Sequence, residues 1–384
     1  MKCAAPVVGG PIRLRRRPRF HMFRTAAAAA CVALGLGLVI APVATAGSPG
    51  RGDPRSFSWQ LVESGTFSTL SGVDAVSPDV AWVGSWGGAV LRTVDGGATF
   101  ADVTPAGGED LLYPDVEASS AEDALLLGFR LDGPFRIFRT SDGGTTWTET
   151  FRADPPSFLN CMAMFDRRHG FVVGDPVDGK FQIVLTSDGG RTWELAPEGG
   201  IPSALDGEIG LFDSGSCAAA TGRKAFFGTA GGAERRVFRS VDFGRTWAVS
   251  AAPIGTGILA LDFRTNRLGL AAGGDMSGPS RRSLARTTDG GATWQAIDDS
   301  ALPADRRTDL AWWSDLRGDQ VALVPDAQQT VFAVGRAGSA VSRDRGKSWE
   351  QFDDGPFISV DCAEGSLACW AVGPTGRIAK LTVS

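Results

Sequence analysis

One eight-residue motif recurs six times along this 384-residue chain and restricts it to a repeat architecture. In the first copy, Thr93–Phe100, the aspartate follows a hydroxyl residue by two positions, and an aromatic residue follows the aspartate by five. Successive aspartates are 46 to 55 residues apart, a spacing typical of a four-stranded propeller blade. The aspartates are Asp95, Asp142, Asp188, Asp242, Asp289 and Asp344, and the aromatic residues are Phe100, Trp147, Trp193, Trp247, Trp294 and Trp349.

The chemistry of the motif is that of a hairpin turn. An aspartate accepts hydrogen bonds from the backbone of its own turn, and glycine adopts the positive φ that such a turn requires. The aromatic residue is expected to anchor the following strand in the blade core. The octet resembles the Asp-box, or BNR repeat, of sialidases, sortilin-type receptors and photosystem II assembly factors. That resemblance implies structural aspartates that are neither catalysts nor metal ligands.

Strand patterns around the motifs give the blade count. By alternation and turn signals, the first unit has a first strand at 73–76 and a fourth at 99–104. Later units start near residues 112, 158, 209, 256 and 308. The C-terminal remainder supplies three more strands, and Phe57–Val62 is the only strand left to complete its sheet. This pairing closes the ring without free sheet edges. The chain is therefore predicted to be an all-β, seven-bladed propeller over residues 47–384.

The N-terminus has the pattern of a signal peptide. Residues 1–46 hold seven Lys/Arg and no acid, and Ala26–Val39 is an apolar run too short for a typical membrane span. Ala44–Ala46 provides small residues for cleavage before Gly47. Cleavage is favoured over an uncleaved anchor, and Arg16-Arg17 leaves the choice between general and twin-arginine export open. The mature chain is expected to be periplasmic or secreted, with no membrane span.

The charge and composition of residues 47–384 exclude several classes of function. With 31 Lys/Arg against 43 Asp/Glu, the net charge is −12, which argues against nucleic acid as a partner. His169 is the single histidine after residue 46, and it is read as part of a surface turn. No phosphate loop, dinucleotide fingerprint or metal-spaced Cys/His cluster occurs, so no cofactor and no metal are expected.

Four cysteines remain after residue 46, and export permits disulfides. Cys362 and Cys369 flank a short hairpin turn, and a bond between them would brace the blade that closes the ring. Cys161 and Cys217 fall in the inner parts of blades three and four, where a second bond is plausible. The alternative is four buried free thiols.

Binding residues are expected on the face opposite the repeated turns, where the loops between second and third strands and between blades meet. Charged side chains there could hold a charged ligand or orient a protein, although each one taken singly is more simply a solvated surface group. The candidates are Tyr113, Asp115, Asp175, Asp178, Lys180, Glu208, Arg235, Asp275 and Arg282.

A sialidase-type reaction is not supported by the sequence. It needs a tyrosine nucleophile in a late blade, whereas the chain has one tyrosine, Tyr113, early in the sequence. Arg136 looks like a sialidase arginine, but it lies in an expected third strand. No catalytic residue is assigned. A two-carboxylate glycosidase stays the alternative; converging acids with raised pKa beside a sugar-sized pocket would favour it.

Over the whole mature chain, the resemblance is to exported bacterial propellers that are similar to the photosystem II assembly factors. It rests on the six motifs and on stretches such as Asn160–Asp166 and Gly174–Phe181. It implies a non-enzymatic platform for a protein partner in the cell envelope. Carbohydrate is the second possible ligand, and a purely structural surface protein is a third reading. We expect a monomer.

Overall fold

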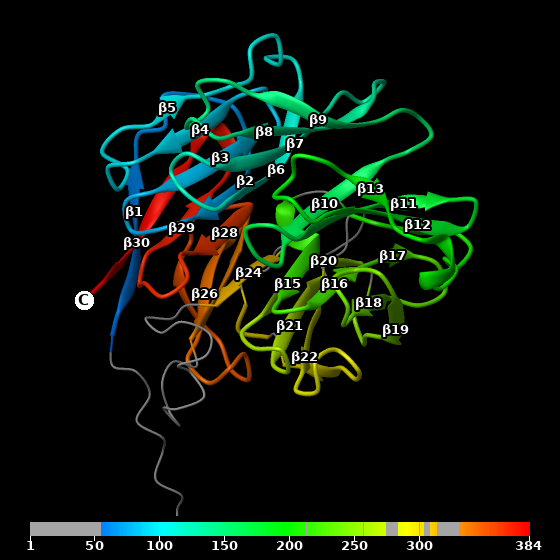
Figure 1. Cartoon of the computed structure of the whole chain (residues 1–384). Coiled ribbons are helices and arrows are strands. Elements are labelled where there is room, and N and C mark those ends of the chain that lie inside the picture. The colour runs from blue at the N-terminus through cyan, green and yellow to red at the C-terminus, as the bar shows by residue number, and fades with distance from the viewer. Residues whose placement is uncertain are drawn as a thin grey trace, which may run out of the picture. The chain divides into compact units, whose positions relative to one another are not determined.

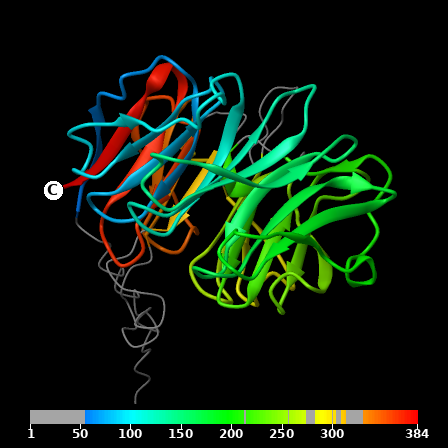
Figure 2. The same ribbon diagram turned by 45° about the horizontal axis from the view of Figure 1, so that its top comes forward.

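The computed structural model describes residues 55–211, 214–255, 257–273, 283–298, 300–302, 308–312 and 330–384. These residues form seven four-stranded antiparallel sheets, arranged as the blades of a β-propeller (Figures 1 and 2). The predicted fold class and blade count are confirmed. Residues 1–46, the predicted signal peptide, lie outside the described residues.

Each of blades one to six is a meander whose strands follow one another in chain order, from the innermost strand to the outermost. Blade one contains β2 (Leu70–Ala75), β3 (Ala81–Ser85), β4 (Val90–Thr93) and β5 (Ala101–Asp102); blade two β6 (Leu112–Ala118), β7 (Ala124–Phe129), β8 (Phe135–Thr140) and β9 (Thr148–Ala153); blade three β10 (Leu159–Met164), β11 (Gly170–Val177), β12 (Lys180–Thr186) and β13 (Glu194–Leu195). Blade four contains β15 (Ala218–Thr221), β16 (Lys224–Gly228), β18 (Arg236–Ser240) and β19 (Trp247–Ala251); blade five β20 (Ile258–Phe263), β21 (Gly269–Gly273), β22 (Ser283–Thr287) and β23 (Gln295–Ile297); blade six β24 (Thr308–Trp312), β25 (Val331–Gly335), β26 (Gly338–Ser342) and β27 (Glu350–Asp353).

Blade seven is assembled from both ends of the described chain. It contains β28 (Ser359–Cys362), β29 (Cys369–Val372) and β30 (Ile378–Val383), with β1 (Phe57–Val62) as its outermost strand. Six residue pairs join β1 to β30, from Phe57 opposite Val383 to Val62 opposite Ile378. In Figure 1 the blue β1 lies beside the red β30. The predicted closure is confirmed, with the predicted N-terminal strand at its predicted bounds.

The repeated turns share one hydrogen-bond pattern. In blade two, Thr140 Oγ1 donates to Asp142 Oδ1 (2.8 Å), and Asp142 Oδ1 accepts from the Thr146 amide (2.9 Å). Thr146 Oγ1 donates to the other carboxylate oxygen of Asp142 (2.6 Å). The same bonds recur at the other five aspartates. Each carboxylate is therefore occupied by its own turn.

The aromatic residue of each turn packs against the preceding blade. Trp147 meets Trp82 of blade one edge-on, with ring centroids 6.0 Å apart, and its Nε1 donates to Val103 O (2.7 Å). Gly144, three residues before Trp147, approaches the same surface and has a φ of +82°. A Cβ added to Gly144 would lie 2.6 Å from the Cβ of Val103. The motif thus joins neighbouring blades, in addition to turning the chain within one blade.

Three strand boundaries differ from the prediction. The innermost strand of blade one, β2, spans residues 70–75 in place of 73–76. The outermost strand of blade one is shorter than 99–104, because Thr99 bonds to Asp95 and Thr104 bonds to Asp102. Blade four begins at Ala218, not near 209. Glu208–Ile209 forms β14, which pairs with β17 (Ala230–Gly231) in a separate two-stranded sheet. Among the described residues, no helix has the length and apolar character needed to cross a membrane.

Candidate functional site

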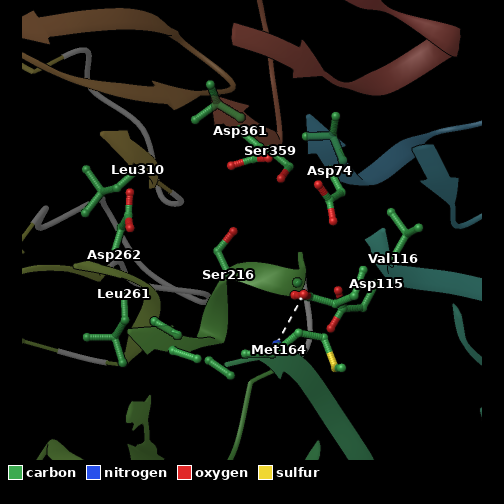
Figure 3. A pocket seen from close by; sticks show the side chains of 18 residues that line it. Asp74, Asp115, Val116, Met164, Ser216, Leu261, Asp262, Leu310, Ser359 and Asp361 are labelled. Carbon is green, nitrogen blue, oxygen red and sulfur yellow. Dashed lines mark hydrogen bonds between the residues drawn. The ribbon is translucent and has the colours of Figure 1, made fainter. Parts of the chain in front are cut away.

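The innermost strands surround a cavity of about 270 Å³ at the centre of the ring. Its lining is dominated by carboxyl groups and serine hydroxyls. Figure 3 shows Asp74 and Asp361 reaching it from blades one and seven, Asp115 from blade two and Asp262 from blade five, with Ser216 between them. A pocket of this size lies just below the range of about 300–1,000 Å³ that is usual for small-molecule sites.

Most of these acids also connect one blade to the next. A carboxylate oxygen on the innermost strand accepts a backbone N–H from the innermost strand of the following blade, which satisfies a donor that the sheet leaves unpaired. The pairs are Asp74 with Ala118 N (2.5 Å), Asp115 with Met162 N (2.6 Å), Glu117 with Met164 N (3.2 Å) and Asp361 with Ala75 N (2.7 Å). Asp309, a buried acid of the innermost strand of blade six that does not line the cavity, makes the same contact with Val360 N (2.9 Å).

Burial dominates the electrostatics of this cluster. Loss of water raises the pKa of Asp115 to about 7 and that of Asp309 to about 6, although their hydrogen bonds act in the opposite direction. Burial and then repulsion between neighbouring carboxyl groups raise the pKa of Asp74 and of Glu117 well above the ordinary value. Burial also raises the pKa of Asp361. The acids of the cavity are therefore held toward their neutral forms.

A short 3₁₀ turn, η2 (Gly215–Cys217), occupies part of the channel and is called the plug here. An added Cβ at Gly215 would collide with the carboxylate of Asp115, so only glycine fits this approach. Ser216 hydrogen-bonds to Asp309. Cys217 forms a disulfide with Cys161 of β10, and both cysteines are buried. The predicted second disulfide is thus present, and it fixes the plug to blade three.

Removing the plug's disulfide should destabilise the propeller more than removing the one in blade seven. Cys161 and Cys217 are 56 residues apart, whereas Cys362 and Cys369 are only seven apart across one hairpin. A longer closed loop restricts the unfolded chain more. The double variant Cys161→Ser/Cys217→Ser is expected to lose about 2–5 kcal/mol of unfolding free energy in urea titrations. An equal loss in Cys362→Ser/Cys369→Ser would contradict this ranking.

Several predicted binding residues have partners within the protein. Tyr113 is fully buried, and its hydroxyl donates to Gly108 O (3.0 Å). Asp115 belongs to the cavity described above. Asp175 accepts from Asn160 Nδ2 (3.0 Å) and from the Gly210 amide (2.8 Å).

The remaining predicted binding residues that the structure describes fall into two groups: one bonds within the protein and the other lines a groove. Burial alone would raise the pKa of Glu208, but hydrogen bonds, led by those from Arg236, hold it below its ordinary value. Arg235 donates to Gly231 O (3.1 Å). Asp178 and Lys180 line a groove on the side of the ring. Asp275 and Arg282 lie outside the described residues.

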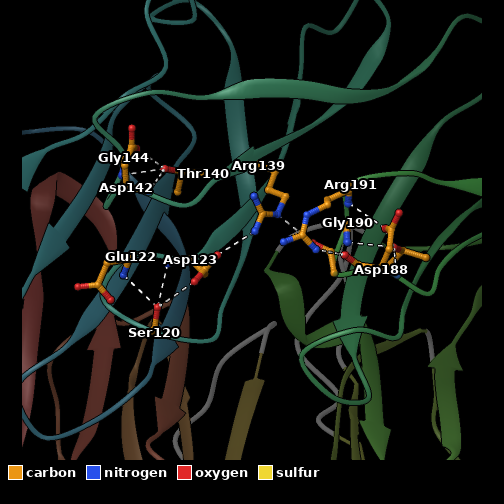
Figure 4. Close-up of polar contacts among 12 residues, drawn as sticks. Ser120, Glu122, Asp123, Arg139, Thr140, Asp142, Gly144, Asp188, Gly190 and Arg191 are labelled. Atoms are coloured by element: carbon orange, nitrogen blue, oxygen red, sulfur yellow. Dashed lines mark hydrogen bonds and ion pairs between the residues drawn. The ribbon is translucent and has the colours of Figure 1, made fainter.

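The face that carries the repeated turns is called the turn face. Turns between first and second strands lie on it as well, because the repeated turn donates a backbone hydrogen bond to them, as Gly189 does to Arg168 O (2.8 Å). Figure 4 shows one such region, where Arg139 bridges Asp123 (2.8 Å) and Gly189 O (3.1 Å) of the next blade.

Charge is divided unequally over the turn face. Its acids outside the repeated motif are Asp79, Glu122, Asp123 and Glu364 on blades seven, one and two, and Asp166 on blade three, whose carboxylate accepts from the backbone of its own turn and contacts His169. Blades three to six instead carry a basic sector, defined here as Arg167, Arg168, Arg191, Arg223, Lys224, Arg267 and Lys347. Within the part of the chain that the structure describes, no ion pair joins these seven residues to a carboxylate.

Two features describe how the cations of the basic sector are held. Lys224 has a lowered pKa, first because of burial and then because of repulsion from Arg239 and Arg267. Several of its cations contact backbone carbonyl groups: Arg168 donates to Ser187 O (3.3 Å) and Arg191 to Asp188 O (2.6 Å). Such contacts leave the positive charge in place.

An aromatic cluster lies inside the basic sector. Phe243 stands in the repeated turn of blade four, where most copies have glycine, and its φ is +62°. A bulky residue in this conformation is an outlier that often marks function. Its ring packs on Phe165 (5.2 Å) and His169 (4.7 Å), and the Arg223 guanidinium lies 5.1 Å from the ring centroid. The sector therefore offers apolar surface beside positive charge.

Sequence reasoning found Asp115 but missed Asp74, Glu117, Asp262, Asp309 and Asp361. The signal was an acid within an otherwise apolar first strand, as in Val73-Asp74-Ala75. The basic sector was also missed, because its arginines are scattered through turns that the ring alone brings to one face. No cluster of three metal-ligating side chains occurs among the described residues.

Comparisons with known proteins support the propeller fold. No protein-family model matches the chain, and no curated protein sequence matches it. Among solved structures, YCF48 from Cyanidioschyzon merolae aligns with a TM-score of 0.60 and 16% identity, over 84% of this chain and 98% of its own. YCF48 bound to D1 peptide gives 0.58 and 16%, over 84% and 94%.

A glycoside hydrolase is also among the similar structures. The GH74 xyloglucanase from Xanthomonas campestris aligns with a TM-score of 0.56 and 17% identity, over 84% of this chain but only 53% of its own. At these identities, the likeness of all three structures shows a shared fold and does not transfer a function. The chain is a seven-bladed β-propeller whose fold is similar to that of YCF48 and to that of part of the GH74 xyloglucanase.

Proposed function

We propose that this chain is an exported, non-catalytic propeller that binds an acidic segment of a protein partner in the cell envelope through the basic sector of its turn face. The carrying observation is the concentration of unpaired cations on blades three to six of a chain whose mature charge is −12. A local positive surface on an acidic protein steers an anionic partner to one face.

The aromatic cluster supports a protein ligand in particular. Phe243 and His169 offer ring surface beside Arg223, and interfaces that bind proteins are enriched in aromatic residues and arginine. One structural neighbour, YCF48, has been solved bound to a peptide. This proposal moves the binding surface away from the opposite face, where Tyr113 and Glu208 already bond within the protein.

The alternative is the carbohydrate-active hydrolase, because acids do converge in the central cavity and their pKa values are raised. A glycosidase, however, requires one carboxylate held ionised beside one held protonated. Each resolved shift among the acids that line the cavity is upward, and Asp115 and Asp361 are occupied by hydrogen bonds to the next blade. These contacts favour a structural role for the cavity acids.

Charge reversal in the basic sector tests the proposal. Tagged mature protein is crosslinked in envelopes of the host, and recovered proteins are identified by mass spectrometry. The variant Arg167→Glu/Arg223→Glu is expected to lose at least about tenfold in recovery of the specific partner at low salt, and wild-type recovery should fall as salt rises. Both arginine side chains are exposed, so the variant should still fold.

A matched reversal on the opposite face provides the control. Arg130 lies in the turn between β7 and β8 and pairs with Asp110, and both side chains are about half exposed. Arg130→Glu should recover the partner as wild type does. The proposal is wrong if the double variant keeps the partner. Recovery of nucleic acid or lipid in place of a protein would also overturn it.

A further inference from the structure

A groove of about 490 Å³ lies on the side of the ring between the outer parts of blades three and four. It exists because the outermost strand of blade three, β13, has only two residues. Its neighbour β12 has seven, so much of that strand's outer edge is not covered by β13 (Figure 1). The size of the groove falls within the range of ligand-binding pockets.

The segment 197–203 forms the outer wall of the groove and is called the arch here. Its ends are held against blade three: the Ala196 amide donates to Ile183 O (2.8 Å), and the Ala204 amide donates to Gly179 O (2.9 Å). Between these contacts the chain turns through a short 3₁₀ helix, η1 (Glu198–Gly200). Between its two fixed ends the arch is separated from the edge of β12, and the groove lies in that space.

Apolar side chains form most of the groove's walls. Ile183 comes from β12, Leu195 from β13 and Ile201 from the arch, while Trp247 closes the side toward blade four. The indole Nε1 of Trp247 donates to Gly244 O (2.8 Å), so its polar atom is already satisfied. Leu195 is 62% exposed, so its side chain offers apolar surface at the groove.

Polar groups at the groove specify what could cover it. Arg245 lines it together with Lys180 and Asp178, and no ion pair joins Arg245 to a carboxylate among the described residues, so its positive charge is available to a ligand. Gln182 also lines it, and its buried Oε1 accepts no hydrogen bond from the described residues. A matching ligand thus combines an aliphatic group, an adjacent carboxylate and an N–H donor. A peptide with a leucine-like residue next to an acid has all three.

We propose that this side groove binds a peptide segment in which an aliphatic residue stands beside an acidic one. The aliphatic side chain would lie against Leu195, Ile201 and Trp247, and the carboxylate would face Arg245. A backbone N–H would donate to Gln182 Oε1. The inference rests on the proposed protein-binding function and adds a second contact, on the side of the ring, for the same acidic partner.

Synthetic peptides test the groove directly. Fluorescein-labelled Gly-Ser-Glu-Leu-Glu-Ser-Gly is titrated with the mature protein, and fluorescence anisotropy is measured. Two matched peptides replace the leucine by serine or both glutamates by lysine. The parent peptide is expected to bind at least about tenfold more tightly than either. Equal binding of the three peptides, or no binding of the parent, would overturn the proposal.

Matched variants locate the binding. Leu195→Glu places a like charge in the groove and should weaken the parent peptide by at least about tenfold. Leu131→Glu changes a leucine that is even more exposed, at 79%, in the turn between β7 and β8, and should have no effect. Binding that survives Leu195→Glu refutes the groove. Arg167→Glu/Arg223→Glu should leave peptide binding intact, so loss of the envelope partner in that variant alone reports on the turn face.

Discussion

The folded propeller is expected to be most stable near pH 4 to 5 and to lose stability as the pH rises toward 8. Buried acids on the innermost strands cause this loss. Their pKa values are raised in the folded chain, to about 7 for Asp115 and about 6 for Asp309, from 3.8 in the unfolded chain. Between these values folding takes up protons, so the free energy of unfolding falls as the pH rises.

The magnitude of this loss is large for a single domain. One pKa unit corresponds to about 1.4 kcal/mol, so Asp115 alone accounts for on the order of 4 kcal/mol between pH 4 and 8. The aspartates of the repeated turns affect the free energy of unfolding at low pH. Hydrogen bonds lower the pKa of Asp95 and Asp289 to about 2, so their contribution is present above pH 4 and is lost as the pH falls toward 2.

Urea titrations across this pH range measure the effect, and Asp115→Asn isolates it. The amide oxygen can still accept from the Met162 amide, but the side chain no longer ionises. The variant should match wild type near pH 5 and exceed its stability by several kcal/mol at pH 8. Asp132→Asn, in an exposed turn, is the control. A wild-type stability that rises from pH 5 to pH 8 would refute the prediction.

Trp59→Ala is expected to remove about 3–5 kcal/mol of unfolding free energy, because it weakens the only sheet that joins the two ends of the ring. Trp59 is buried in blade seven, packs on Phe332 and Phe357 of neighbouring segments, and donates from Nε1 to Ser339 Oγ (2.9 Å). Truncation leaves both a cavity and an unpaired hydroxyl.

Gln60→Ala supplies the matched control on the same strand. Gln60 points to the exposed face of β1, so its backbone pairing with Lys380 remains while no core contact is lost. Its free energy of unfolding, measured by urea titration, should stay within about 0.5 kcal/mol of wild type. A loss in Trp59→Ala no larger than that in Gln60→Ala would mean that the packing of Trp59 does not hold the ring closed.

The parts of the fold that the sequence predicted best are those encoded locally. Phe57–Val62 is recognisable because buried Phe57 and Trp59 alternate with exposed Ser58 and Gln60. The least accurate prediction was the start of blade four, and its cause is not local. Glu208 is drawn into a separate sheet by Arg236 and Thr229, which follow it by more than twenty residues.

The sequence by itself determined the number of blades and the closure of the ring, and it indicated the cysteine pair within one hairpin, which the structure confirms. Each depends on a short pattern, repeated at a fixed spacing or separated by a tight turn. Only the tertiary structure decided where charge collects. The ring brings Asp74, Asp115 and Asp361 into one cavity and Arg167, Arg223 and Arg267 onto one face. Side chains separated by about one blade length cannot influence one another until the blades pack around a common axis.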